Sequence, residues 1–343
     1  MNRYAPVAVP SELRPLLELT QRVGSNRLLT QANTGNSSAK LDGVLWIKAS
    51  GRWMADAFSD DCFIPLDLAE ARHCLRLGID PIERYPRASL ETAMHAALPH
   101  RMVVHVHCVN TICWAVQNDA PRQLQHRLDG LRWQWLPYVG SGMPLAKEIQ
   151  RALSHSDSNV FVLGNHGLVV AGDDAISVET LLTDVRRRLD VPPRPAPPRG
   201  SAILMEICSE APWNLPDDDE VHIFGTDAIS KTILTKGVLY PCQAISFGSR
   251  TPELFRPIYY PAHRLRSRYE DRPFLVIHGR GVVVSRSMTP AELAMLSGLA
   301  QIVQRLDASA PIRYLTESEV AGLGELDQRK EGRTPEHLNV VGA

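Results

Sequence analysis

The sequence predicts an α/β protein, and two observations carry this prediction. Short apolar runs bounded by turn residues, which are typical of strands, alternate along the chain with stretches whose apolar residues recur at helical spacing. Apolar residues make up 44% and charged residues 22% of the 343 residues, as in ordinary globular proteins. This composition excludes a wholly disordered chain, and the length is sufficient for two or three domains.

A proline-rich segment divides the chain into two parts. Val191–Gly200 reads VPPRPAPPRG, and such a segment can neither continue a helix nor lie inside a sheet. It is typical of a semi-rigid extended connector. We therefore predict an N-terminal domain at 1–190, a linker at 191–200, a smaller α/β domain at 201–330 and a polar tail at 331–343.

In the N-terminal part, each predicted element follows from its local pattern. Apolar residues at helical spacing and capping residues indicate the helices, and short apolar or β-branched runs indicate the strands. Helices are predicted at Glu12–Val23, Ser89–Leu98 and Glu179–Leu189, and strands at Val44–Ile47, Cys62–Leu66, Met102–Val106, Asn159–Leu163 and Leu168–Val170. Ser89 is expected to cap its helix, which places Glu91 in the first turn. Gln31–Lys40 is rich in small polar residues and has no apolar run, so a loop is predicted there.

The second part ends in a pattern similar to the end of the first. Phe274–Val284 reads FLVIHGRGVVV and precedes an amphipathic helix predicted at Ala291–Leu306, which is the order found around FVLGNHGLVV. Matching the two places Arg280 opposite His166 and leaves the second copy without a metal ligand. We interpret the pattern as a degenerate duplication. The alternative is a chance recurrence of an order that is common in α/β proteins.

Charge, hydropathy and cysteine content exclude several classes of protein. The 37 basic and 38 acidic residues give a formal charge of −1, which leaves no electrostatic footprint for nucleic acid or an anionic membrane. No run of 18 apolar residues occurs, and the start of the chain lacks the apolar core of a signal peptide. The six cysteines form no C-x-x-C pair, which favours reduced thiols over a disulfide scaffold. A soluble, cytoplasmic protein is expected.

Three histidines form a candidate metal site. His105 and His107 lie two residues apart on a predicted strand, so their side chains should share one face. Two neighbouring imidazoles suit a divalent metal, and a third nitrogen ligand would complete a zinc site with one open position. His166, in a predicted tight Gly-Asn-His-Gly turn, is the candidate third ligand. An H-x-H pair alone is weak evidence, and the surrounding pattern strengthens it.

The motifs of residues 12–190 resemble the class II aldolase/adducin family and occur in that family's order. They are TGNSS (Thr34–Ser38), an apolar strand leading into Ser50-Gly51, SLE (Ser89–Glu91), HVH (His105–His107) and NHGLVV (Asn165–Val170). Three further segments are similar to the rhamnulose/fuculose-phosphate-aldolase-like part of bifunctional aldolase/short-chain dehydrogenase proteins. These are Gly35–Lys40, Ser89–Arg101 and IRYLTE (Ile312–Glu317). No G-x-G-x-x-G motif follows a strand, so no nucleotide site is predicted.

The resemblance implies a fold and a set of site residues. The fold would be a three-layer α/β/α sandwich around a largely antiparallel sheet. Zinc would be bound by His105, His107 and His166, Glu91 would be the catalytic acid/base, and Asn36, Ser50, Gly51 and Ser89 would bind the phosphate or another anionic end of the substrate. Small polar residues and glycine at a turn expose backbone N–H groups, which suits anion binding. Lys40 could add a charge, although a solvated lysine is the ordinary interpretation.

The resemblance also implies a reaction. It points to an aldehyde-lyase of carbohydrate metabolism that performs a (retro-)aldol reaction on a small sugar-derived ketose, phosphorylated or otherwise anionic, through a zinc-stabilised enediolate. Glu91 would move a proton at the carbon beside the carbonyl, which suits a carboxylate whose pKa is raised by burial. An epimerase or a decarboxylase on the same scaffold remains open. A non-catalytic, adducin-like interaction protein is disfavoured because the histidines are retained.

Three further expectations concern partners and neighbouring residues. Family members assemble as rings, so a homo-oligomer acting on a small molecule is implied. A catalytic tyrosine near the chain end cannot be placed, and the candidates are Tyr259, Tyr260, Tyr269 and Tyr314. His95 lies four residues after Glu91, on the same helix face. It either packs in the core or orients the carboxylate.

Overall fold

The N-terminal part is built on a seven-stranded sheet. The computed structural model describes residues 9–210, 212–248, 254–255 and 272–323. The strand order is β3-β2-β1-β4-β7-β6-β5. The strands are β1 (Asn36–Leu41), β2 (Val44–Lys48), β3 (Phe63–Asp67), β4 (Met102–Val106), β5 (Trp133–Leu136), β6 (Val160–Leu163) and β7 (Gly167–Gly172). All neighbours are antiparallel except β5 and β6, so the predicted largely antiparallel sheet is confirmed.

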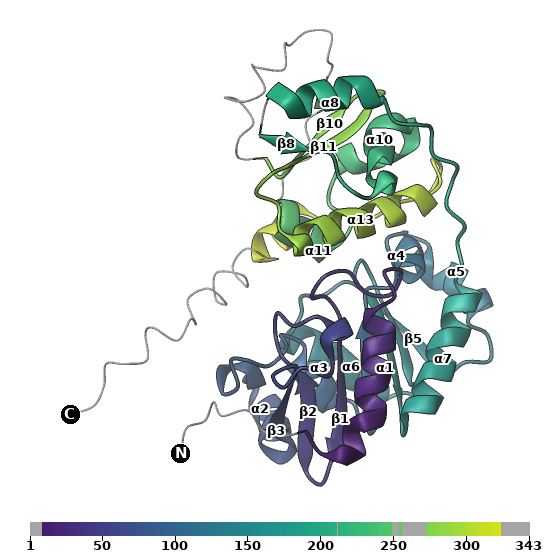
Figure 1. The fold of residues 1–343 in the computed structure, drawn as a ribbon. Coiled ribbons are helices and arrows are strands. Elements are labelled where there is room, and N and C mark those ends of the chain that lie inside the picture. Colours follow the sequence, from purple (N-terminus) through teal and green to yellow (C-terminus); the bar gives the residue numbers. More distant parts are fainter. Residues whose placement is uncertain (1–8, 211, 249–253, 256–271, 324–343) are drawn as a thin grey trace.

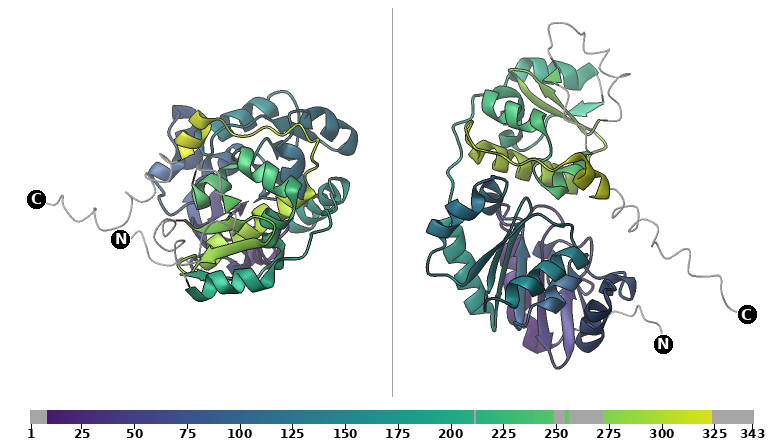
Figure 2. Two further views of the ribbon diagram at one scale, coloured as in Figure 1. Left: turned by 90° about the horizontal axis from the view of Figure 1, so that it is seen from above. Right: turned by 180° about the vertical axis from the view of Figure 1, so that it is seen from behind.

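Helices cover both faces of this sheet, which gives the predicted three layers (Figures 1 and 2). One face carries α1 (Arg14–Gly24), α5 (Ala120–Arg127) and α7 (Ala175–Arg188), and the other carries α2 (Leu68–Leu77), α3 (Thr92–Ala97) and α6 (Met143–Leu153). Alternation along the strands sorts the apolar side chains between the layers. In β4, Val104 and Val106 pack with α1 and α7, whereas Val103 packs with α3 and α6.

The predicted loop at Gln31–Lys40 is wrong over its second half, which forms β1 between β2 and β4. The sequence does not reveal this strand as an apolar run, because its buried side chains are polar. Ser37 is fully buried, and its hydroxyl lies 2.6 Å from the hydroxyl of Thr20. Ser38 is equally buried, and its hydroxyl lies 2.6 Å from Nδ1 of His95. Because buried polar groups are acceptable once they are hydrogen-bonded, this strand needs no apolar run.

The helix that follows Ser89 begins later than predicted. The helix α3 is Thr92–Ala97, and Glu91 occupies its N-cap position rather than the first turn. Ser89 lies before the helix, where its hydroxyl accepts from the Glu91 backbone N–H at 3.3 Å and its carbonyl accepts from the hydroxyl of Thr92 at 2.7 Å. Because of this local turn, the helix begins only at Thr92, and the Glu91 side chain points away from the helix toward His105 of β4.

The C-terminal part is a smaller α/β unit. Its four-stranded sheet has the order β8-β11-β10-β9. The elements are α8 (Ser201–Glu210), β8 (Trp213–Asn214), α9 (Ile223–Thr226), α10 (Ala228–Lys236), α11 (Pro241–Phe247), β9 (Leu254–Phe255), β10 (Phe274–Ile277), β11 (Gly281–Ser285) and α13 (Pro290–Arg305). Strands β10 and β11 form an antiparallel hairpin before α13, as β6 and β7 do before α7. The predicted strand-turn-strand-helix order is therefore present, while the duplication and the domain bounds stay predictions.

The two parts pack against each other through one apolar cluster. The proline-rich Val191–Gly200 contains no helix or strand and runs along one side of the molecule from α7 to α8 (Figure 1). The helix α4 (Val109–Ala115), which follows β4, packs against α13. Ile112 of α4 and Leu299 and Val303 of α13 are all fully buried in this shared cluster. No helix in the described part of the chain has both the length and the apolar character needed to cross a membrane.

Candidate metal centre

His105 and His107 come together at the end of the central strand β4. His105 is its penultimate residue, and β4 is held between β1 and β7. His107 follows directly after the strand. Their Nε2 atoms lie 3.1 Å apart, and the ring centroids are separated by 5.0 Å. The predicted pair of neighbouring imidazoles is therefore present in the structure.

His166 reaches the same point from the turn between β6 and β7. Its ring centroid lies 5.0 Å from that of His105 and 5.1 Å from that of His107. The turn needs a left-handed residue, and Asn165 supplies it at a φ of 50°. It also needs Gly167, where an added Cβ would lie 2.5 Å from the carbonyl oxygen of Val106. This close approach brings β7, and with it His166, to the end of β4.

Hydrogen bonding and burial set the protonation of the two β4 histidines. His105 is fully buried, and its Nδ1 lies 3.0 Å from the carbonyl oxygen of Leu168. Because a carbonyl only accepts, Nδ1 carries the hydrogen and Nε2 presents a lone pair. Burial is the main cause that lowers the pKa of His105, to about 4, and it lowers the pKa of His107 well below its usual range. Both imidazoles are therefore neutral near pH 7.

Glu91 stands directly beside the three histidines. Its Oε2 lies 3.2 Å from Nε2 of His105, and its Oε1 lies 3.2 Å from Nε2 of His166. Burial acts to raise the pKa of Glu91, but the positive charge that His105, His166 or His107 carries when protonated, together with the hydrogen bond to His166, outweighs burial and holds this pKa well below its usual range. The raised pKa under which a carboxylate best suits this proton transfer is not found in this arrangement. Glu91 rests as a carboxylate.

This donor set fits a divalent metal ion. The ligating atoms of His105, His107 and His166 all lie within 4.8 Å of one another, and all three residues are buried. The Nε2 atoms of His105 and His107 and the Glu91 carboxylate therefore face one another with their lone pairs. A cation is the partner that satisfies such a cluster.

A hydrogen-bonded chain behind the cluster fixes the direction of Glu91. Nδ2 of Asn36 donates to Glu91 Oε2 at 2.8 Å and to the hydroxyl of Ser89 at 3.0 Å. His95 Nε2 contacts Oδ1 of the same amide, and its Nδ1 lies 2.6 Å from Ser38 Oγ. Burial lowers the pKa of His95 to about 3, so the ring is neutral: Nε2–H donates to Asn36 while Nδ1 accepts from Ser38. His95 thus acts on Glu91 through Asn36.

A cavity of about 290 Å³ opens onto the cluster. Of the predicted site residues, Asn36, Ser50, Gly51, Ser89, Glu91, His107 and His166 line it, and His105 lies behind them. The structure thus brings all of the predicted residues together. The far wall belongs to the C-terminal unit and includes Cys242, Ile245 and Met295. The sequence had linked that unit to the site only through the candidate tyrosines, and it pointed to none of these three residues.

Two lysines differ from their sequence interpretation. Lys40 was considered as a charge for the anion site, but its Nζ donates to the His100 carbonyl at 2.7 Å and it is absent from the cavity lining. Lys48, which the sequence analysis passed over, is almost fully buried below the cavity. Its Nζ donates at 3.3 Å to the carbonyls of Asn33 and Ala49, in the two loops that line the site.

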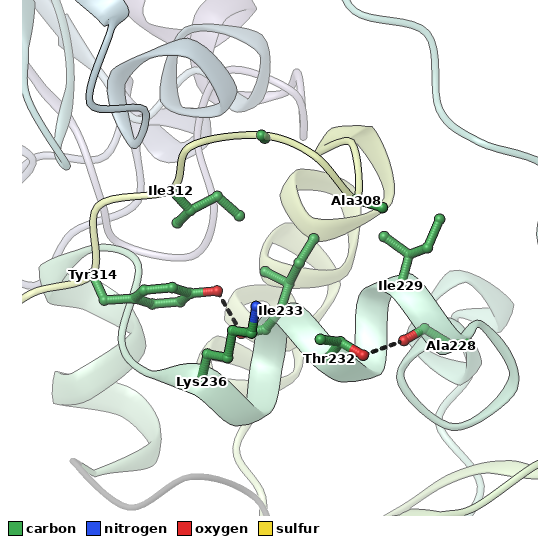
Figure 3. A pocket seen from close by; sticks show the side chains of 9 residues that line it. Ala228, Ile229, Thr232, Ile233, Lys236, Ala308, Ile312 and Tyr314 are labelled. Atoms are coloured by element: carbon green, nitrogen blue, oxygen red, sulfur yellow. Dashed lines mark hydrogen bonds between the residues drawn. The ribbon is translucent and has the colours of Figure 1, made fainter.

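A second cavity, of about 320 Å³, contains the one candidate tyrosine that the structure describes (Figure 3). The hydroxyl of Tyr314 donates to the Ile233 carbonyl at 3.2 Å, among apolar residues of α10. Tyr314 does not line the histidine cavity. Tyr259, Tyr260 and Tyr269 lie outside the described residues.

The comparison with known families agrees with this geometry. A family model described as the class II aldolase and adducin N-terminal domain matches residues 14–186, half of the chain. The chain belongs to this family. The matched residues carry all three histidines and Glu91, and they form the seven-stranded sheet.

Relatives of this class II aldolase and adducin domain resemble it at low identity. The uncharacterized oxidoreductase YuxG of Bacillus subtilis (strain 168) is 28% identical over 190 residues, which cover 48% of this chain and 27% of that protein. The chain therefore spans about a quarter of the length of this relative, in keeping with the resemblance to one part of a bifunctional protein.

Two solved structures resemble about half of the chain. The N-terminal class II aldolase domain of a conserved protein from Thermoplasma acidophilum is 23% identical, with a TM-score of 0.47 over 55% of this chain and 97% of that chain. The L-fuculose-1-phosphate aldolase from Thermus thermophilus is 18% identical, with a TM-score of 0.38 over 51% of this chain and 91% of that chain.

Proposed function

We propose that the protein is a zinc-dependent lyase that performs a (retro-)aldol reaction on a small sugar-derived, anionic ketose. The observation that carries this proposal is the position of Glu91. Its carboxylate contacts His105 and His166 and accepts from Asn36, inside a cavity lined by small polar residues. A proton-transfer group, a metal ligand set and an anion-binding loop thus share one cavity.

The three histidines would hold the zinc ion. When bound, zinc supplies Lewis-acid chemistry that stabilises the negative charge developing on the substrate oxygens. The neutral state of His105 and His107 leaves a nitrogen lone pair on each ring for the metal.

Glu91 would move the proton that the reaction requires. In the cleavage direction, the substrate hydroxyl would give its proton to the Glu91 carboxylate, the neighbouring C–C bond would break and an aldehyde would leave. The electron pair of that bond passes to the ketone fragment, whose carbon then takes up a proton. Glu91 would deliver that proton, and in the synthesis direction its carboxylate would remove it. Because its pKa lies below the usual range, Glu91 is ionised near pH 7 and can accept a proton.

The anionic end of the substrate would bind at the loops on the cavity wall. Asn36, Ser50, Gly51 and Ser89 line this wall. The backbone at Gly51 has a φ of 77°, and an added Cβ would meet open space there. The wall therefore offers polar and backbone groups without a side chain that blocks access.

A substrate screen tests the reaction. The zinc-loaded protein is incubated with ketose 1-phosphates and with their unphosphorylated and carboxylated relatives, and aldehyde release is measured. We expect aldehyde from an anionic ketose. An epimer or carbon dioxide as the sole product would contradict the lyase and select one of the alternatives on this scaffold.

Glu91→Gln tests the proton transfer. We expect zinc and substrate to bind, because the amide keeps the shape of the side chain, while turnover falls by about 10²–10⁴-fold. Zinc content and steady-state kinetics measure both. Glu206→Gln, an exposed position on α8, is the matched control. Near-normal turnover in Glu91→Gln would assign the proton transfer to another residue.

His107→Ala tests the metal ligands. We expect the variant to fold, because the core beneath it is large, and to lose zinc. Metal analysis of the purified protein measures this, with His126→Ala on the exposed face of α5 as the control. Stoichiometric zinc in His107→Ala would refute the assignment.

A further inference from the structure

The C-terminal unit touches the histidine cluster at two separate places. Cys242 of α11 lies with its Sγ 3.3 Å from Nδ1 of His107. Arg313, in the segment after α13, donates from Nη1 to Oδ1 of Asn165 at 2.9 Å. Asn165 immediately precedes His166. His107 itself and the residue next to His166 therefore each have a partner in the C-terminal unit, which carries none of the three histidines.

The contact at Cys242 has a defined direction. Nε2 of His107 faces His105 Nε2 at 3.1 Å, inside the cluster, so the outer Nδ1 of a neutral His107 ring carries the hydrogen. That N–H points at the sulfur, which accepts it. Cys242 is half-buried and belongs to no disulfide. The sulfur therefore fixes both the tautomer and the rotation of the His107 ring.

The contact at Asn165 holds the turn that carries His166. Besides accepting from Arg313, the Asn165 amide donates to the carbonyls of Leu239 at 2.8 Å and of Arg313 at 2.9 Å. All three bonds reach into the C-terminal unit. They stabilise a left-handed backbone at Asn165 that a residue other than glycine adopts at a cost.

Arg313 is itself fixed in place. Its Nη2 pairs with Glu319 at 2.5 Å, and its guanidinium carbon lies 5.5 Å from the ring centroid of Tyr138. Its backbone N–H donates to the carbonyl of Val116 at 2.7 Å. These contacts hold the IRYLTE segment in a defined position against the turn that carries His166. The proposed metal and anion sites assign no role to this segment.

We propose that the C-terminal unit is a component of the metal centre, in which Cys242 positions His107 and Arg313 positions His166 through Asn165. The inference rests on the proposed metal site and does not depend on the reaction or the substrate. It explains why the chain continues beyond the family domain: the additional unit supplies the outer hydrogen-bond partners of the ligands.

Variants at Cys242 test the first contact. Zinc affinity is measured by competition with a chromophoric chelator, and the cobalt-substituted protein is examined by absorption. We expect Cys242→Ala to weaken zinc binding by about 10–100-fold, the usual effect of removing such an outer partner. Cys242→Ser retains an acceptor and should recover most of the affinity. Cys208→Ala, another half-buried cysteine of the same unit, should bind zinc as the wild type does.

Variants at the turn test the second contact. Arg313→Ala and Asn165→Gly should each weaken zinc binding by about tenfold or more. Glycine accepts the left-handed backbone of residue 165, so Asn165→Gly removes the side-chain bonds while the turn can still form. It keeps the test valid if Arg313→Ala fails to fold. Arg286→Ala, whose guanidinium contacts the Cys208 carbonyl at 3.2 Å, is the control.

The outcomes separate this inference from the proposed function. If the wild type binds no zinc, the metal site itself fails. If the wild type binds zinc and the variants at Cys242, Arg313 and Asn165 bind it equally well, the role of the C-terminal unit is refuted. A sulfur-to-cobalt absorption band that disappears in Cys242→Ala would make Cys242 a direct ligand and would overturn its positioning role.

Discussion

At the scale of single residues, Lys48 is the most instructive side chain of the site. It is 2% exposed, and its ammonium group donates to the carbonyls of Asn33 and Ala49. A buried charge needs such partners because desolvation is expensive. Here the partners belong to the two loops that line the cavity and that we propose to bind the anionic end of the substrate. Lys48 therefore joins these loops and places a positive charge beneath them.

Lys48→Met should weaken both the fold and anion binding. It leaves buried carbonyls without a donor, which costs about 1–3 kcal/mol of the free energy of unfolding. It also removes a positive charge beneath the cavity, so binding of inorganic phosphate should weaken. Urea unfolding and phosphate titration measure the two effects. Lys236→Met, at the second cavity, should leave phosphate binding unchanged. Unchanged phosphate binding in Lys48→Met would show that this charge does not contribute.

Lys40 should give the stability a specific pH dependence. Burial, and next the charge of Arg72, lower the pKa of Lys40 from 10.5 to about 7, and His95 and His100 lie near the same ammonium group. Between these pH values the unfolded chain holds a proton that the folded protein has released. The free energy of unfolding therefore rises as pH increases from about 7 to 10.5.

Lys40→Met should remove this part of the rise. Denaturant unfolding of both proteins across that pH range measures the difference in slope. Parallel curves for the wild type and the variant would show that Lys40 keeps an ordinary pKa in the folded protein.

At the scale of elements, the sequence predicted five strands of the seven-stranded sheet and missed two, β5 (Trp133–Leu136) and β1, whose buried side chains are polar. β2, β4, β6 and β7 each show an apolar run. In β1, buried hydroxyl groups replace the apolar side chains, and their partners on α1 and α3 are distant in the sequence. Local pattern cannot reveal such partners, because the compensation exists only in the folded protein.

The candidate site, like the sheet, was predictable from the sequence only in part. His105, His107, His166 and Glu91 lie in motifs with recognisable order, and the structure brings them together. The groups that orient them were not predictable in this way. Cys242 is an isolated cysteine in the sequence, and its proximity to His107 depends on how α11 packs over the cavity.

Gly167→Ala should disturb the element that carries His166. The added methyl group would lie 2.5 Å from the carbonyl oxygen of Val106, a backbone atom that cannot move without shifting β4. We expect a loss of about 1–3 kcal/mol of stability from this overpacking, together with weaker zinc binding. Thermal unfolding and metal analysis measure both. Gly322→Ala, where the methyl group meets open space, is the control. Full zinc affinity in Gly167→Ala would mean that the strand ends adapt.

At the scale of the whole molecule, the two parts share a core. Ile112 of the N-terminal part lies in one cluster with Leu299 and Val303 of α13. Arg27 pairs across the same boundary with Asp218, and with Glu220 at 2.8 Å. The proline-rich segment marks where the chain crosses from one part to the other. It carries no information on how tightly the parts pack.

This shared core predicts cooperative unfolding. We expect one calorimetric transition for the whole chain. Ile112→Ala should lower the free energy of unfolding by about 2–5 kcal/mol, because it leaves a cavity at the boundary. Two resolved transitions in the wild type would show that the parts are independent. The homo-oligomer implied by the family resemblance stays a prediction, which sedimentation velocity checks.

The contacts of Cys242 and Arg313 also have a consequence for the order of biosynthesis. All three histidines and Glu91 are translated before the proline-rich segment, whereas the partners of His107 and Asn165 are translated after it. A nascent chain that has completed the seven-stranded sheet still lacks both outer contacts. The histidine cluster therefore acquires its full set of hydrogen bonds only after the ribosome has passed Arg313.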